Sequence, residues 1–101
     1  MNEYEQIVNE FIFLNEDYNF IKYEQYFRYG RYYSTWKKDN YEIIVGYSNR
    51  KRSYPTIEII EHDPLTIFRY QEDSNTIEKN PEKRLHKAAE WLKEYMKDKT
   101  L

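Results

Sequence analysis

The amino-acid sequence predicts an α+β fold: an N-terminal helix, a meander sheet of four or five antiparallel strands, and a C-terminal helix. Two periodicities support this order. Between residues 18 and 54, aromatic and β-branched residues alternate with polar ones at the spacing of pleated strands, whereas the flanking segments repeat at the 3.6-residue spacing of helices. The length of 101 residues suffices for one small core and is too short for two, so residues 1–101 are expected to form a single domain.

The first segment is expected to form an amphipathic helix. One stripe at helical spacing should enter the core, and it consists of Tyr4, Ile7, Val8, Phe11, Leu14 and Tyr18. Phe13 lies about opposite this stripe, so we expect it to be exposed or covered by a partner. Asn19 directly follows the last periodic residue, and helices commonly end in a left-handed conformation that asparagine tolerates.

Alternation then predicts three strands joined by turns. The first ends at Gly30, which allows a tight turn or a bulge. The second contains Trp36 and ends at Asp39-Asn40, a two-residue hairpin turn in which both residues tolerate positive φ. In the third strand, Gly46 indicates a bulge or a close backbone approach.

A fourth strand is expected to begin near Tyr54 and to continue through Ile60. Pro55 fits this assignment because proline is acceptable at a strand start or on an edge strand. The apolar residues of segment 65–70 could add a short fifth strand, and the sequence leaves that choice open. A polar loop then runs from residue 71 to residue 80.

The C-terminal helix has the strongest start signal in the chain. Asn80 is suited to cap its first turn, and Pro81 is suited to its first helical position. Leu85 and Leu92 belong to its apolar stripe and are expected in the core. Two amphipathic helices both need an apolar surface, which one face of an antiparallel sheet supplies. If both helices cover that face, the other face is exposed.

Charge is segregated along the chain. The total is -2, but residues 1–21 hold five acids and no base, whereas residues 22–52 hold eight bases and three acids, a net of +5. Such segregation arises when a helix of one charge packs against a sheet of the opposite charge. It also marks binding faces. The exposed sheet face should therefore carry tyrosines and bases.

The composition argues against several classes of function. The absence of cysteine excludes disulfides, thiol catalysis and thiolate metal sites. The two histidines, His62 and His86, stand alone without the spacing of a metal site or a catalytic triad. We therefore predict a protein that is not an enzyme and that uses no cofactor and no metal.

The expected location is the cytoplasm. The longest strongly apolar run is four residues, against about 20 for a membrane-spanning helix. The first residues lack the basic region of a secretion signal, so no membrane association is expected. The abundance of Asn, Lys, Ile, Tyr and Glu beside only two alanines suggests an AT-rich bacterial genome.

Protein binding fits the aromatic and basic surface best. Tyrosine, tryptophan and arginine are enriched at interface hot spots because they bury large areas and still form hydrogen bonds. The alternative that Tyr32 and Trp36 face the helices also stands, because a one-residue error in register reverses every facing. The predicted partner-binding residues are Tyr26, Arg28, Arg31, Tyr32, Trp36, Arg50, Lys51 and Arg52.

Two further functions remain as alternatives. Residues 28–33 mix arginine and tyrosine as single-stranded RNA binders do, although they lack the residue order of an RNP1 motif. The pI of about 5.7 also argues against nucleic acid as a partner. The other alternative is a structural homo-oligomer, such as a homodimer formed through the exposed aromatic face.

Residues 11–20 resemble the start of small bacterial immunity proteins of polymorphic toxin systems. In those proteins a helix ends in a Tyr-Gly-Phe-like turn before a sheet, and this chain has Tyr18-Asn19-Phe20 in that place, with asparagine where glycine is usual. The aromatic hairpins and the charged closing helix extend the likeness to most of the chain. The resemblance implies a cytoplasmic antidote that binds and blocks a toxin domain, and it transfers no catalytic residues.

Overall fold

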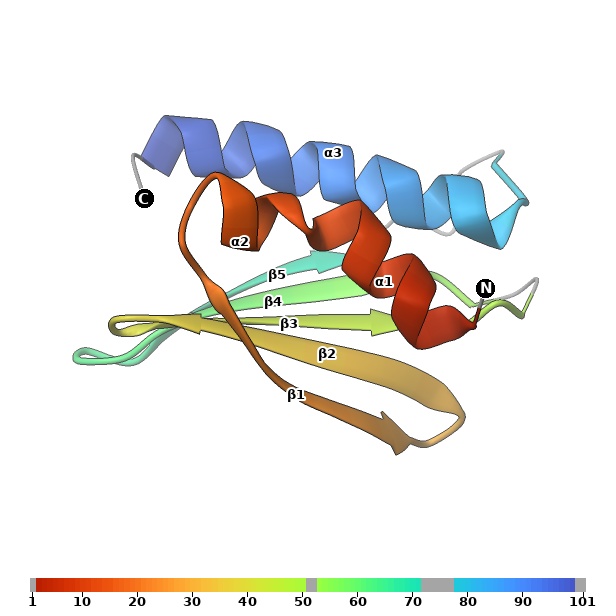
Figure 1. Ribbon diagram of the computed structural model, residues 1–101, viewed down its shortest axis with the longest axis horizontal. Helices are drawn as coiled ribbons and strands as arrows, with labels where there is room; N and C mark the ends of the chain where they lie inside the picture. Colours follow the sequence, from red (N-terminus) through yellow and green to blue (C-terminus); the bar gives the residue numbers. More distant parts are fainter. Residues whose placement is uncertain (1, 51–52, 72–77, 100–101) are drawn as a thin grey trace.

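A short helical region, five strands and one long helix follow one another in the computed structural model, which describes residues 2–50, 53–71 and 78–99 (Figure 1). This order confirms the predicted α+β class. The elements are α1 (Glu3–Phe11), α2 (Phe13–Glu16), β1 (Ile21–Arg28), β2 (Arg31–Lys38), β3 (Tyr41–Tyr47), β4 (Thr56–Glu61), β5 (Thr66–Gln71) and α3 (Pro81–Lys99).

The strands form one antiparallel sheet in the order β1-β2-β3-β4-β5, so each strand pairs with its neighbours in sequence. The segment that the sequence left open is therefore a fifth strand. All helices lie on the same side of this sheet, with α3 running along it and α1 and α2 beside α3 (Figure 1). No helix of the described residues covers the opposite side of the sheet.

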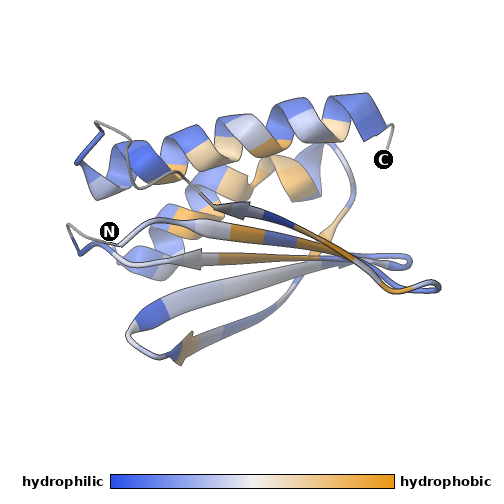
Figure 2. Ribbon diagram, turned by 180° about the vertical axis from the view of Figure 1, so that it is seen from behind, coloured by the Kyte–Doolittle hydropathy of each residue, from blue (hydrophilic) through white to orange (hydrophobic). Residues whose placement is uncertain are grey.

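The core lies between the helices and the sheet, where the hydrophobic segments of both layers meet (Figure 2). On the sheet, Trp36 lies beside Ile43 of the next strand, and both are buried. From the helices, Phe11 and Leu92 are fully buried. Val8, which the helical stripe predicted as a core residue, is only half-buried.

Among the described residues, no helix is long and apolar enough to cross a bilayer.

The first helical segment is interrupted at Ile12, and this break corrects the predicted single helix. Ile12 is exposed, whereas Phe13 on the following turn is buried. Lys93 of α3 covers the ring of Phe13, with its ammonium group 5.2 Å from the ring centre. Phe13 is thus covered by the protein itself, because the break turns it towards α3.

Turn residues take the strained conformations that the sequence suggested. Asn19 has φ 63°, so asparagine occupies the left-handed conformation usual for glycine at this helix end. Tyr29 and Gly30 both have positive φ in the turn between β1 and β2, which is the pattern of a type I′ hairpin turn. In the next hairpin Asp39 has φ 52°, whereas Asn40 stays at negative φ.

The start of α3 is confirmed as predicted. The side-chain oxygen of Asn80 accepts a hydrogen bond of 3.2 Å from the backbone N–H of Lys83, which satisfies a donor of the first turn. Leu85 is buried with Leu92. Residues 72–77 of the predicted polar loop lie outside the described part of the chain.

Candidate functional site: the open face of the sheet and its arginine corner

Three predicted partner-binding residues share the helix-free side of the sheet, which we call the open face. Tyr26 lies opposite Tyr33 and Arg28 lies opposite Arg31, and facing residues in an antiparallel pair project to the same side. Arg50 adjoins this face from the loop after β3, so Arg28, Arg31 and Arg50 together form the arginine corner. The other two loop candidates, Lys51 and Arg52, lie outside the described residues.

Tyr32 and Trp36 do not lie on the open face, which corrects their prediction as surface contacts. Trp36 is 1% exposed and belongs to the core. Tyr32 is half-buried, and its ring meets the edge of the Tyr4 ring of α1 at a centroid distance of 4.9 Å. Side chains alternate along a strand, so Arg31 and Trp36, five residues apart in β2, must project to opposite faces.

A pair of stacked tyrosines forms the aromatic part of the open face. The rings of Tyr26 and Tyr33 lie 4.9 Å apart and are nearly parallel, at 13°. Burial raises the pKa of Tyr26, with Tyr33 as the next contribution, so Tyr26 presents a neutral hydroxyl group. Sequence reasoning named Tyr26 and missed Tyr33, although Tyr33 has the same parity in the second strand as Arg31.

Gly46 makes room for the Tyr33 ring. A Cβ atom at this position would lie 2.7 Å from Cε1 of Tyr33 and 2.8 Å from the hydroxyl oxygen of Thr56. The sequence indicated a bulge or a close backbone approach here. The register through Gly46 is regular, and the close approach is made by an aromatic side chain. The bulge of this sheet lies in β1, between Lys22 and Glu24.

Arg31 is fixed to the segment that leads into β4. Its guanidinium group donates hydrogen bonds to the hydroxyl of Ser53 at 2.8 Å, to the carbonyl of Tyr54 at 2.9 Å and to the hydroxyl of Thr56 at 3.3 Å. All three acceptors are neutral. The positive charge is therefore held in a defined place, and no carboxylate of the described residues pairs with it.

A second arginine, Arg84 of α3, holds the same segment from the helix layer. It is 2% exposed, and it donates hydrogen bonds to the carbonyl of Glu78 at 2.6 Å and to the carbonyl of Ser53 at 3.1 Å. Its guanidinium carbon also lies 4.3 Å from the centre of the Tyr54 ring. Sequence reasoning missed Arg84, because its acceptor on Ser53 is 31 residues away along the chain.

The arginine corner borders a hollow of about 400 Å³. Arg50 closes one side, with its guanidinium group 3.5 Å from the position that a Cβ atom on Gly30 would take. Within the described residues, no acidic group pairs with any of the three arginines of the corner. The hollow can therefore receive an anionic group through donors that are already in position. Its lining consists of Tyr29, Gly30, Arg31, Ser48, Arg50, Ser53, Tyr54 and Thr56.

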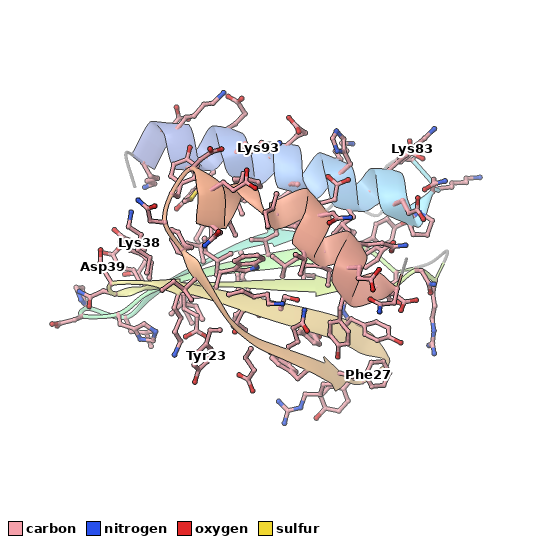
Figure 3. The ribbon with its side chains drawn as sticks, in the orientation of Figure 1. Tyr23, Phe27, Lys38, Asp39, Lys83 and Lys93 are labelled. Carbon is pink, nitrogen blue, oxygen red and sulfur yellow. The ribbon has the colours of Figure 1, made fainter. Side chains whose placement is uncertain are left out.

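The far end of the open face is also cationic and aromatic, but a carboxylate lies close to its positive charge. The ammonium group of Lys37 lies 3.7 Å from the ring centre of Tyr23, which points to the open side (Figure 3). Lys37 also lies 3.9 Å from a carboxylate oxygen of Glu42. This end of the face is therefore closer to charge balance than the arginine corner.

The two histidines lie on separate elements with different acidic neighbours. His62 at the end of β4 lies 3.9 Å from Glu42, and His86 of α3 lies 2.9 Å from Glu10. Both are largely exposed. In the described part of the chain, no group of three His, Cys, Asp or Glu side chains is arranged to hold a metal ion.

Comparison with known proteins found no relative of this chain. The chain matches no protein family, no curated protein and no solved structure.

Proposed function

We propose that this protein binds another protein stoichiometrically through the open face and the arginine corner, as a cytoplasmic immunity protein that neutralises a toxin domain. The observation that carries the binding proposal is Arg31. Its guanidinium group is oriented by three neutral acceptors and faces a hollow, and no described carboxylate balances its charge. An acidic side chain of a partner would meet donors that require little reorganisation.

A protein partner fits this face better than RNA does. Tyr26 and Tyr33 already stack on each other, so each ring has one face occupied where an RNA base would stack. Three glutamates also interrupt the bases along the open face, and the whole chain carries a net charge of -2. The glutamates are Glu24, Glu42 and Glu58. Such a surface suits a single carboxylate surrounded by mixed contacts, whereas a phosphate backbone requires a continuous cationic track.

The role as an antidote rests on the resemblance of residues 11–20 to immunity proteins. The main departure from that pattern is Asn19 in place of glycine, and its φ of 63° is the conformation that the glycine would adopt. The side-chain amide of Asn15 also closes the turn by donating a hydrogen bond of 2.9 Å to the carbonyl of Phe20. The departure in sequence therefore does not weaken the resemblance in local structure.

The experiment is capture of a partner from native lysate, followed by affinity measurements with purified variants. Arg50→Glu changes an exposed residue and Tyr26→Ala a half-buried one outside the core, and each should weaken binding at least tenfold. Lys83→Glu in α3 is the matched control, because it makes the same charge change on an exposed helix residue away from the open face. Equal affinity of all three variants and the wild type would place the interface elsewhere.

The antidote role has its own test with the captured protein. If that protein is a toxin, the wild type should suppress its toxicity in cells, and Arg50→Glu should suppress it less at equal expression. RNA retained through purification and lost steeply with salt would instead favour the nucleic-acid alternative. An absorbance spectrum of clean protein without retention on heparin would argue against that alternative.

A further inference from the structure

The outer side of β1 is a free sheet edge with several exposed apolar side chains. β1 pairs with β2 alone, and the side chains of Ile21, Tyr23 and Phe27 are 68%, 59% and 58% exposed. Natural edge strands are usually short, charged, bulged or interrupted by proline, because unpaired backbone groups invite another strand. β1 is eight residues long without proline, and its bulge lies before Glu24. Residues 24–28 therefore keep a regular free edge that can pair with a strand of complementary charge.

Two opposite charges on β1 have no ion-pair partner among the described residues. Glu24 and Arg28 are both exposed and both project to the open face, and neither forms an ion pair with a described residue. They are four residues apart on one strand, about 13 Å, so they cannot contact each other. In an antiparallel pair of two β1 strands centred on Tyr26, Glu24 of each copy lies directly opposite Arg28 of the other.

The backbone fits the same register. Arg28 and Arg31 close the two-residue turn, and paired residues in an antiparallel ladder alternate between those that bond to the partner strand and those that turn outward. Counted from that turn, Gln25 and Phe27 direct their backbone groups to the free edge. Centring on Tyr26 places Gln25 of one copy opposite Phe27 of the other, so these groups can pair.

Neighbouring registers are less favourable. Centring the pair on Gln25 would set Glu24 opposite Tyr26 and leave Arg28 without a partner on the regular part of the edge, so neither ion pair would form. The bulge between Lys22 and Glu24 also breaks the regular edge before residue 24, which confines the contact to residues 24–28. The charges and the bulge thus favour the register in which Tyr26 lies at the centre of the strand pair.

We propose that two copies of this chain associate through their β1 edges, with a twofold axis at Tyr26 and reciprocal Glu24–Arg28 ion pairs, to form a continuous ten-stranded sheet. Each copy uses the same edge, so the contact joins two copies and adds no third. The other edge, β5, offers no equivalent charge pattern, since its Arg69 lies 3.5 Å from Glu58 of the adjacent strand. A contact of five residues per strand is smaller than a standard interface, so the dimer should be weak and concentration-dependent.

The test is analytical ultracentrifugation of the purified protein alone over a wide concentration range, so it does not depend on the proposed partner. The wild type should shift from monomer to dimer as concentration rises. Glu24→Arg and Arg28→Glu should each weaken dimerisation at least tenfold, because each places like charges opposite one another twice. Both side chains are exposed, and circular dichroism should show that the fold is retained. Lys83→Glu on α3 is the control and should dimerise like the wild type.

Charge exchange identifies the register. The double variant Glu24→Arg/Arg28→Glu restores both pairs in reverse and should dimerise again. An equimolar mixture of the two single variants should form heterodimers, because every opposed pair is then Arg against Glu. A wild type that stays monomeric at every concentration would overturn the proposal. A dimer that tolerates both single variants, or that the double variant and the mixture fail to restore, would overturn it too.

Discussion

Tyr47 brings a phenol group into the core without a hydrogen-bond partner in the described structure. The side chain is fully buried, and burial raises its pKa to about 12, with smaller contributions from Glu82 and Glu3. In the unfolded chain the group titrates near 10. The neutral form is therefore favoured by folding, and stability should be intact below pH 10 and should fall as the pH rises through 12.

The expected loss from this one group is about 2 to 3 kcal/mol across that window, at about 1.4 kcal/mol for each unit of pKa difference. Tyr47→Phe removes the titrating group and an unpaired buried hydroxyl, so its stability near neutral pH should equal or slightly exceed that of the wild type. Urea unfolding at a series of pH values measures both. Parallel stability curves for the two proteins above pH 10 would contradict the assignment.

Gly46 is a second residue whose close contacts predict the effect of a substitution on stability. Gly46→Ala places a methyl group 2.7 Å from the Tyr33 ring and 2.8 Å from Thr56, which must displace one of them. We expect a loss of about 1 to 3 kcal/mol by denaturant unfolding, in spite of the better strand propensity of alanine. Combining it with Tyr33→Ala removes the nearest contact. The double variant should therefore lose less than the sum of the two single losses.

At the scale of the element, α3 depends on its buried stripe. Leu92 is fully buried against the sheet side of the core, so Leu92→Ala should cost about 2 to 5 kcal/mol, which is a large part of the stability of a small domain. Glu94→Ala in the same helix is exposed and should change stability by no more than about 0.5 kcal/mol. Thermal or urea unfolding of both variants measures the difference. An unchanged midpoint for Leu92→Ala would remove α3 from the core.

Elements were predicted from the sequence more reliably than the faces of their side chains. Asn80 and Pro81 carry local start signals, and the turn at Asp39 carries a local turn signal, so these boundaries were accessible. The break at Ile12 has no proline or glycine to announce it. It follows from packing of Phe13 against α3, which the sequence does not display.

The candidate site was predicted in part for a similar reason. Tyr26, Arg28 and Arg31 lie together on the open face, but Trp36 was grouped with them against the alternation of its own strand. That error could have been avoided, because Arg31 and Trp36 differ by an odd number of residues. Arg84 could not have been found, since its acceptors become neighbours only after the sheet and helix layers pack together. The absence of catalysis and the identity of a partner stay predictions.

At the scale of the whole molecule, Arg84 connects the helix layer to the sheet. Arg84→Met keeps most of the side-chain volume but leaves the carbonyls of Glu78 and Ser53 without these donors. We expect a loss of about 2 to 4 kcal/mol, because two charge-assisted hydrogen bonds are lost and the part-buried carbonyls are left without these donors. Lys83→Met, one residue earlier and exposed, is the matched control. Equal unfolding midpoints for the two variants would show that the buried hydrogen bonds of Arg84 add nothing.

The segment Ser53–Tyr54 is held by Arg31 from the sheet and by Arg84 from α3, and this double attachment couples recognition to local opening of the molecule. Any motion that lifts the start of α3 also releases one of the two supports of the arginine corner. A ligand that favours the ordered corner must then disfavour that opening by the same free energy, since such coupling is reciprocal. Occupancy of the corner should therefore slow the exchange of amide hydrogens in the first turns of α3, on the opposite side of the sheet from the bound group.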